Sequence, residues 1–481
     1  MIITLRKRKR MKEQPFRQDK EEIQELLKQY NNLRAGKSYS FLEEDAFERI
    51  IDYYDENDDF VKALEVVETG LEYFPYSSHL LIKYADLLIV TRRYHESLKI
   101  LERAELFDSA DINIPILKTD AYLALDQQDK AVIVLEEALA YFDGEDRQEL
   151  LFELADVYDD YEEFDKVFDC LKMILEEDLT NEEALYKICF WTDFTGRNEE
   201  SIKLHQHIIN EHPYSELAWF NLGAAYQGIK LYEKAVDAYQ YAVTVDEKFD
   251  YAYRNMGDAY IRLRMYKEAI EVLQKVVELT RPEEVIFEAI GHCFHRLSNY
   301  AQARFHYRKA SHMNPDDSKL YYKIALTYIN EQQWEHAIKQ LDHAMRIQRN
   351  VAEYNLAMGE CRMNVQQYRE AIHHFGLVIK QRPRNVNGWE SLIKCLHKKE
   401  SFAEASEQCL AALQATEGKP VFLFYYAASL IGDGRWKEAL LQLEKAMEKA
   451  PKLLKKFIEL NPSVLQKAQV VDIIARYKKR K

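Results

Sequence analysis

The sequence predicts an all-α fold, a solenoid of about twelve helix-turn-helix repeats with capping helices at its ends. Three observations predict it. Apolar residues recur at helical spacing through most of the chain. Their pattern repeats with a period of 34 residues. The 481 residues include only 14 glycines and 10 prolines, so turn-forming residues are few, as expected of a mostly helical protein.

Residues 216–249 show the repeat most clearly. A first apolar stripe contains Trp219, Leu222, Gly223 and Tyr226, and a second contains Ala235, Tyr239 and Ala242. Gly228 and Lys230 interrupt the pattern between the stripes, which indicates two helices joined by a turn. This stretch resembles a tetratricopeptide repeat almost residue for residue. The resemblance implies a right-handed superhelical solenoid, in which each hairpin buries its apolar face by stacking on its neighbours.

The same frame fits about 410 of the 481 residues. Repeats begin at residues 44, 78, 112, 148, 182, 216, 250, 284, 318, 352, 386 and 420, with one two-residue insertion near Asp143 and Gly144. Three columns keep phase: an aromatic residue at the inter-helix turn, a small residue three positions later, and a proline that closes the second helix. The repeats at 148 and 182 match least well, because Val167 and Ser201 replace the small alanine and Asn198 replaces the turn aromatic.

The two ends of the chain depart from the frame. Residues 1–17 hold a basic run from Arg6 to Lys12 and are expected to form a disordered tail, although such a run can also bind nucleic acid or anionic lipid. Residues 18–43 are expected to form a capping helix, over residues 21–33, and a linker before the solenoid of residues 44–452. Residues 453–481 are expected to form closing helices with a basic end, because a terminal repeat must cover its open apolar face.

Composition favours a cytoplasmic protein outside the membrane. The start, MIITL followed by RKRKR, has no apolar segment of the kind that a signal peptide needs. The longest apolar run, Val421 to Ile431, has 11 residues and is too short to span a bilayer. The six cysteines show no CxxC spacing, which favours reduced thiols in a packed interior.

Motifs that carry chemistry do not occur, so we expect no enzyme, no cofactor and no metal. The sequence has no P-loop, no GxSxG and no HExxH. His292 and His295 lie one helical turn apart but have no evident third ligand. Carboxylates are so numerous that pairing two of them as an acid and a base would be arbitrary.

The solvent-facing stripe of each first helix supplies the candidate binding site. This stripe lies one, four and eight residues after each repeat start. In tetratricopeptide proteins, which the chain resembles, the same stripe lines the concave groove. The expected groove residues are Asp45, Glu48, Asp52, Asp86, Asp120, Glu149, Phe152, Asp156, Tyr186, Phe190 and Phe220. The acidic members would receive a basic segment and the aromatic members would anchor it. Two alternatives stay open: the carboxylates serve solubility, and the aromatic residues pack against neighbouring helices.

The charge distribution agrees with an acidic groove. Residues 44–181 hold 12 Lys and Arg against 37 Asp and Glu, a net charge of −25, whereas residues 182–453 have a net charge of −1. Such a surface disfavours nucleic acid as the ligand. Asn221 and Asn255 match a common asparagine of the family, but Phe220, Ala224 and Val285 stand where a clamp for an acidic chaperone tail would need charged or amide groups. That kind of partner is therefore disfavoured.

The sequence thus predicts a non-catalytic scaffold or adaptor that holds a segment of a partner protein in the concave groove. The partner would be a basic peptide segment with apolar anchors, and the alternative role is a self-associating assembly platform. Exposed apolar residues on the outer helices would favour that alternative. The oligomeric state stays open.

Overall fold

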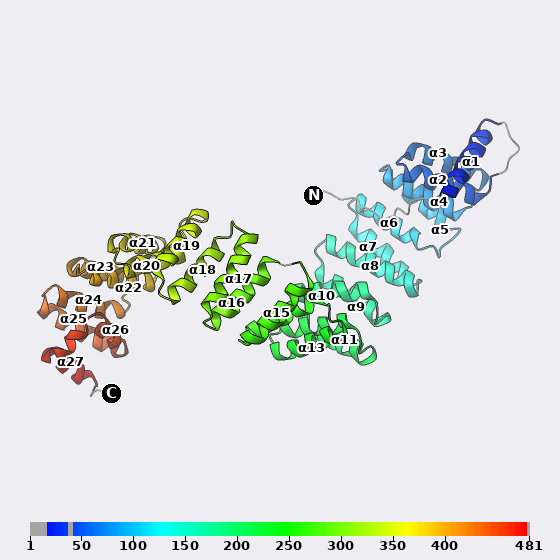
Figure 1. Ribbon diagram of the computed structural model, residues 1–481. Helices are drawn as coiled ribbons and strands as arrows, with labels where there is room; N and C mark the ends of the chain where they lie inside the picture. Colours follow the sequence, from blue (N-terminus) through cyan, green and yellow to red (C-terminus); the bar gives the residue numbers. More distant parts are fainter. Residues whose placement is uncertain (1–16, 37–41, 282, 479–481) are drawn as a thin grey trace. The chain divides into compact units, whose positions relative to one another are not determined.

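The computed structural model describes residues 17–36, 42–281 and 283–478 of the chain, and these residues are helical with no strand among them (Figure 1). The chain divides into two compact units, residues 1–231 and 232–481. The predicted all-helical repeat fold is confirmed. The predicted basic tail lies outside the described residues, apart from Arg17, with which the first helix begins.

The first unit holds twelve helices within its described ranges, and their order follows the predicted repeats. They are α1 (Arg17–Arg34), α2 (Glu44–Glu56), α3 (Phe60–Tyr73), α4 (Ser78–Val90), α5 (Tyr94–Glu105), α6 (Asn113–Ala124), α7 (Gln128–Ala138), α8 (Gly144–Asp160), α9 (Phe164–Glu177), α10 (Glu182–Thr195), α11 (Asn198–Glu211) and α12 (Glu216–Gly228).

The second unit continues the same order. Its helices are α13 (Tyr232–Val245), α14 (Asp250–Arg262), α15 (Tyr266–Leu279), α16 (Glu284–Arg296), α17 (Tyr300–Met313), α18 (Ser318–Asn330), α19 (Trp334–Ile347), α20 (Ala352–Asn364), α21 (Tyr368–Gln381), α22 (Val386–Lys398), α23 (Phe402–Ala415), α24 (Val421–Gly432), α25 (Trp436–Lys449), α26 (Leu454–Leu460) and α27 (Ala468–Lys478). Two 3₁₀ turns, Pro451–Leu453 and Pro462–Gln466, join the last helices.

The turns inside the repeats share one backbone feature, a residue with positive φ just before the second helix. These residues are Asp58, Arg92, Asp126, Glu162, Gly196, Lys230, Arg264, Ser298, Gln332, Gln366, Glu400 and Gly434. A left-handed residue lets the chain leave one helix and reverse direction within a few residues. Successive members are 34 residues apart, except for a step of 36 between Asp126 and Glu162, where the insertion near Gly144 falls. The backbone therefore has the period that the sequence columns predict.

The predicted columns take the places that helix packing requires. The turn aromatic is the first residue of the second helix in each repeat that has one, from Phe60 of α3 to Trp436 of α25. The small column is fully buried wherever it is alanine, as at Ala63 and Ala439. Small residues there allow the two helices of a hairpin to approach closely. Each unit buries its apolar residues in a succession of clusters between neighbouring helices.

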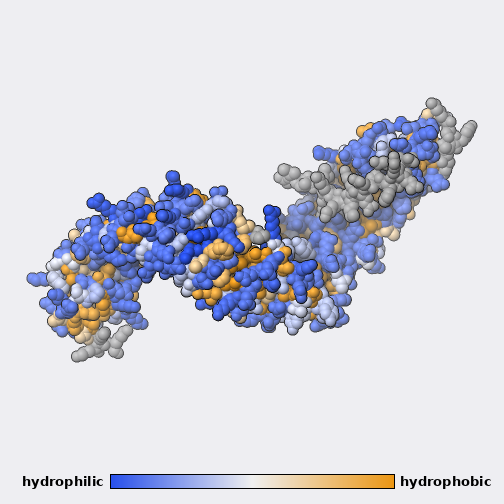
Figure 2. Space-filling view, in the orientation of Figure 1, coloured by the Kyte–Doolittle hydropathy of each residue, from blue (hydrophilic) through white to orange (hydrophobic). Residues whose placement is uncertain are grey.

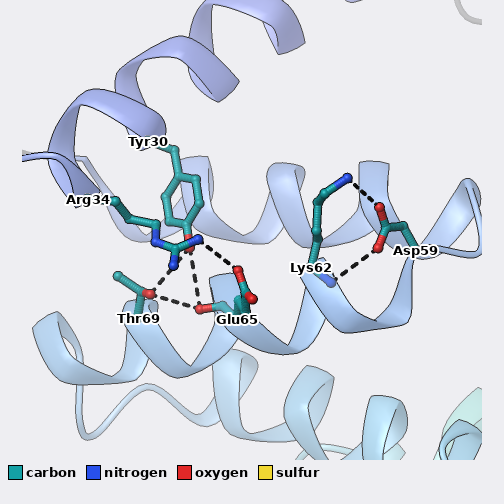
Figure 3. A network of polar contacts seen from close by, with 6 residues as sticks. All are labelled: Tyr30, Arg34, Asp59, Lys62, Glu65 and Thr69. Atoms are coloured by element: carbon teal, nitrogen blue, oxygen red, sulfur yellow. Dashed lines mark hydrogen bonds and ion pairs between the residues drawn. The ribbon is translucent and has the colours of Figure 1, made fainter.

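The first helix covers the open face of the first repeat, as expected. The Tyr30 side chain is 3% exposed, and its ring meets the Phe47 ring edge-on, with the two ring centroids 6.2 Å apart. Its hydroxyl lies 3.4 Å from the Glu65 carbonyl oxygen and 3.3 Å from the Thr69 hydroxyl (Figure 3). Arg34 pairs with the Glu65 carboxylate at 2.7 Å. The helix begins at Arg17, four residues before the predicted start.

The last helices close the other end of the second unit. Helix α24 is buried over the whole run from Val421 to Ile431, and Phe457 of α26 and Val470 of α27 pack into the same core. Lys456 pairs with Glu390 of α22 at 3.0 Å. The run that the sequence shows as its longest apolar stretch is thus the interior helix of the final repeat. No helix in the described ranges is long and apolar enough to cross a membrane.

Candidate partner-binding surface

The carboxylates predicted on α2 are partly neutralised within the first unit. Asp45 and Asp52 are exposed, and Glu48 is half-buried. Asp52 forms an ion pair with Lys83 of α4. The His79 Nδ1 atom lies 4.0 Å from Glu48 Oε1, and burial is the main cause that raises the pKa of the Glu48 carboxyl. These residues offer less net charge to a partner than their number suggests.

The carboxylates predicted on α8 stand among other carboxylates. Glu149 is exposed, and its pKa is raised, first by burial and then by the negative charges of Glu153 and Asp146. The predicted aspartates of α4, α6 and α8 are half-buried: Asp86, Asp120 and Asp156. Glu149 therefore stands in a region of like charge.

The turn between α8 and α9 concentrates this charge further. Residues 159–165 read DDYEEFD, and four carboxylates of this turn are exposed: Asp159, Asp160, Glu162 and Asp165. The pKa of Asp159 is raised, first by burial and then by repulsion from Asp160 and Asp156. Glu163 pairs with Lys166 at the start of α9. We call these seven residues the acidic turn.

Helix α10 presents an aromatic face beside the acidic turn. Asn181 caps the start of the helix, and its side-chain oxygen accepts a hydrogen bond from the Ala184 N–H at 2.9 Å. The left-handed Gly196 caps the other end. Its buried face consists of Ala184, Leu185, Ile188 and Thr192. On its other side, Tyr186, Phe190 and Phe194 follow one another at one-turn spacing and are 70%, 60% and 57% exposed.

Four rings of α9 and α10 form one cluster, Phe164, Phe190, Trp191 and Phe194. The Phe190 and Phe194 rings are stacked at 5.9 Å, and the Phe190 ring meets Trp191 edge-on at 4.9 Å. Phe164, which belongs to the acidic turn, lies 4.7 Å from Phe194 and 5.5 Å from Trp191. We call these residues the α10 aromatic cluster. Phe164 thus joins the clustered rings to the acidic turn.

The other predicted anchors lie on the neighbouring first helices. Phe152 of α8 is half-buried, and the Lys187 ammonium of α10 lies 4.7 Å from its ring centroid. Phe220 is half-buried on α12, which packs against α10. Of the predicted anchors, Tyr186 and Phe190 offer most of their surface to solvent.

A buried polar network fixes α12 against α10 and α11. His205 is fully buried, and its Nδ1–H donates to the Ser201 carbonyl at 2.7 Å, so its Nε2 accepts from the Asn221 amide at 3.1 Å. The same amide donates to the Leu185 carbonyl at 2.7 Å. The Ser201 hydroxyl also reaches Thr192 at 3.2 Å. This network occupies the repeat that the sequence marked as one of the two most divergent.

A cavity of about 410 Å³ opens where α10 and α12 begin. It is lined by Thr180, Glu182, Leu185, Glu211, His212, Pro213, Tyr214, Ser215, Glu216 and Leu217. None of the predicted groove residues lines it. Of the lining residues, Tyr214 is 84% exposed.

Two groups in the described ranges place three candidate metal ligands within 4.8 Å of one another: Glu44, Glu48 and His79, and Glu284, Glu288 and Asp317. In the second group, Glu288 already binds Lys323. Exposed carboxylates often gather in this way without an ion, so we assign no metal to either group. The six cysteines are free thiols, and burial is the main cause that raises the pKa of each.

Sequence reasoning missed part of this surface. It named Tyr186 and Phe190 as anchors but not Phe164, Trp191 or Phe194. Two signals could have found the rest: the one-turn spacing from Tyr186 to Phe194, and the density of carboxylates around Phe164.

Comparison with family models decides the family. Residues 356–420 match the tetratricopeptide repeat, and residues 230–355 match the C-terminal ARM domain of tetratricopeptide repeat protein 21. The chain is a tetratricopeptide repeat protein. This family serves protein–protein interaction and is typically non-catalytic, so a protein partner is supported. A search of the curated proteins finds no match to this tetratricopeptide repeat protein.

Solved structures similar to this tetratricopeptide repeat protein include YrrB, described as a tetratricopeptide repeat protein with an unusual peptide-binding site. The two sequences are 18% identical, the match covers 38% of this chain and 95% of that chain, and the TM-score is 0.35. The Cut9–Hcn1 hetero-tetramer of APC/C matches at 15% identity, 81% and 90% coverage and a TM-score of 0.36. The C-terminal part of a repeat protein from Cytophaga hutchinsonii matches at 14% identity, 53% and 99% coverage and a TM-score of 0.44. Similarities this distant carry no argument about function.

Proposed function

We propose that this protein is a non-catalytic adaptor that holds a basic segment of a partner protein on the first helices of its N-terminal unit. The repeat array, which we take as residues 44–452 between two capping segments, would supply the surface. The carboxylates from Asp45 to Asp156 would attract the segment, and Phe152, Tyr186, Phe190 and Phe220 would anchor it. The exposed face of α10 is the observation that carries this proposal, because large aromatic side chains rarely stay exposed together without a binding role.

Charge supports the same partner chemistry. The net charge of −25 between residues 44 and 181 would raise the local concentration of a cationic segment and speed its association. Burial, and after it the repulsion from neighbouring carboxylates, raises the pKa values of Glu149 and Asp159 in the free protein. A bound cation would relieve this repulsion. Affinity would come from many modest contacts along several helices.

A displayed library of random peptides tests the proposal. The wild-type chain is expected to select peptides enriched in Lys and Arg together with apolar residues. A variant with Asp52, Asp86, Asp120 and Asp156 changed to Lys should lose this selection. The matched control changes the same number of exposed carboxylates on second helices to Lys: Glu72, Glu102, Glu137 and Glu176.

The control should select the same peptides as the wild type. Selection of one peptide class by all three proteins would show that the carboxylates of the first helices do not bind the segment. Loss of selection in both variants would assign the effect to net charge alone. Light scattering on each protein separates partner binding from the alternative role, since self-association would give a concentration-dependent mass without any peptide.

A further inference from the structure

The α10 aromatic cluster exposes ring faces that no described cation covers. Phe190 and Phe194 are 60% and 57% exposed and stack on each other at 5.9 Å. Within the described ranges, no lysine or arginine lies over the rings of Phe190, Trp191 or Phe194. The faces of aromatic rings carry negative potential, and tryptophan binds cations best. The cluster therefore has the electrostatic character of an open cation site.

The acidic turn supplies carboxylates to the same corner. Phe164 belongs both to the turn and to the cluster, so the exposed Asp160, Glu162 and Asp165 stand within a few residues of a clustered ring. The segment from Glu153 to Asp165 contains seven carboxylates and no basic residue. A ligand at this corner would meet ring faces and carboxylates together.

The turn between α10 and α11 already holds one guanidinium against α9 in such an environment. The Arg197 guanidinium carbon lies 4.3 Å from the Phe168 ring centroid. The same group pairs with Asp169 and Glu200, each at 2.7 Å. One aromatic face, two carboxylates and the Asp165 carbonyl oxygen, which accepts a hydrogen bond from Arg197 at 3.0 Å, together hold this arginine side chain. The α10 corner offers ring faces and carboxylates at the surface.

We propose that the α10 aromatic cluster and the acidic turn form a binding site for the guanidinium group of an arginine in the partner segment. The inference rests on the proposed function and names the side chain that the segment inserts. Arginine fits better than lysine because its planar group stacks on a ring face while its N–H groups bind carboxylates. The ammonium of lysine is more strongly hydrated and loses more on leaving water.

Two peptide probes of equal charge test this specificity. One repeats Gly-Ser-Arg and the other repeats Gly-Ser-Lys, and each carries a fluorescent label for anisotropy titration with the full chain at physiological ionic strength. The arginine probe should bind about fivefold more tightly, which corresponds to one favourable ring contact at a surface. The double substitution Phe190→Leu and Phe194→Leu keeps apolar bulk but removes the ring faces, and it should bring the two affinities together.

The control is a second exposed ring pair in the same unit, Tyr76 and Phe107, whose centroids are 5.4 Å apart. Changing both to leucine should leave the preference for arginine intact. A further variant, Asp160→Asn with Asp165→Asn, alters only exposed polar groups and should weaken the arginine probe even if the leucine variant fails to fold.

The outcomes separate this inference from the proposed function. Equal binding of both probes to the wild type, with loss of both in the Asp→Lys variant described above, would overturn the arginine site and leave the acidic groove supported. An arginine preference that persists in both the leucine and the asparagine variants would also overturn it. Failure of the wild type to bind either probe would count against both proposals.

Discussion

Lowering the pH should destabilise the region from α10 to α12 through one residue, His205. The imidazole is fully buried, and its two nitrogens are engaged by the Ser201 carbonyl and the Asn221 amide. Burial lowers the pKa of His205 to about 4, although the hydrogen bond to Ser201 acts in the opposite direction. A protonated ring could not accept from Asn221, so the network would lose one of its bonds.

The size of the effect follows from proton linkage. An unfolded histidine has a pKa near 6.5, so between pH 6.5 and about 4 the unfolded state binds a proton that the folded state does not. The free energy of unfolding therefore falls as the pH falls through this window. The stabilising contribution of neutral His205 is fully present above pH 6.5. Between pH 7 and pH 5 the loss amounts to about 2 kcal/mol, and it approaches about 3 kcal/mol below pH 4.

A repeat protein unfolds region by region, so the measurement must be local. Urea titrations at pH 7 and pH 5, each followed by a brief deuterium pulse at one fixed pH, would report the unfolding midpoint of peptides from α10 to α12. Substitution His205→Gln removes the titrating group and should abolish most of the pH difference in these peptides. Peptides from α2 to α5 serve as the internal reference. An unchanged pH difference in the variant would refute the reasoning.

Three further changes test the packing of single sites. Gly359→Ala should lower the free energy of unfolding by about 1–3 kcal/mol, because the new methyl group would lie 2.6 Å from the buried Phe375 ring. Gly376→Ala meets open space and should stabilise its helix by about 0.5–1 kcal/mol. Urea unfolding compares the two variants. Asn181→Ala removes the N-cap of α10 and should cost about 1 kcal/mol, read by deuterium exchange in α10. Asp159→Asn should stabilise α8 by less than about 1 kcal/mol at pH 7. This gain should vanish as the pH falls through the raised pKa of Asp159. Urea unfolding of α8 at several pH values would measure the change.

The sequence predicts the repeat fold closely because several independent columns constrain it at once. The turn aromatics begin the second helices, as Phe60 and Tyr266 do, and the one insertion falls where the spacing of left-handed residues widens. Few residue types are compatible with a position at which the chain reverses direction. The same holds for a position that lies between two closely packed helices. These positions therefore fix the starts of the second helices, whereas α8 begins at Gly144, four residues before the predicted repeat start at residue 148.

The candidate surface is less predictable because periodicity shows a face but not its neighbours. The stripe positions indicated Asp52 and Phe190 correctly as exposed. They could not show that Lys83 neutralises Asp52, since that lysine lies on another helix. Nor could they show that Trp191 and Phe194 join the same cluster as Phe164, because the contact depends on how α10 packs against α9.

The divergent repeat at 182 and the candidate surface have a common structural origin. Helix α10 packs on α9 and α12 but barely touches its own partner α11, unlike the closely packed pair α8 and α9. Ser201 stands where other repeats place the small alanine, and with His205 it forms a polar interior that α12 completes through Asn221. The inner side of α10 is held by its buried residues and by the polar contacts from α11 and α12. Tyr186, Phe190 and Phe194 can therefore stay exposed, which is the condition that a partner-binding face requires.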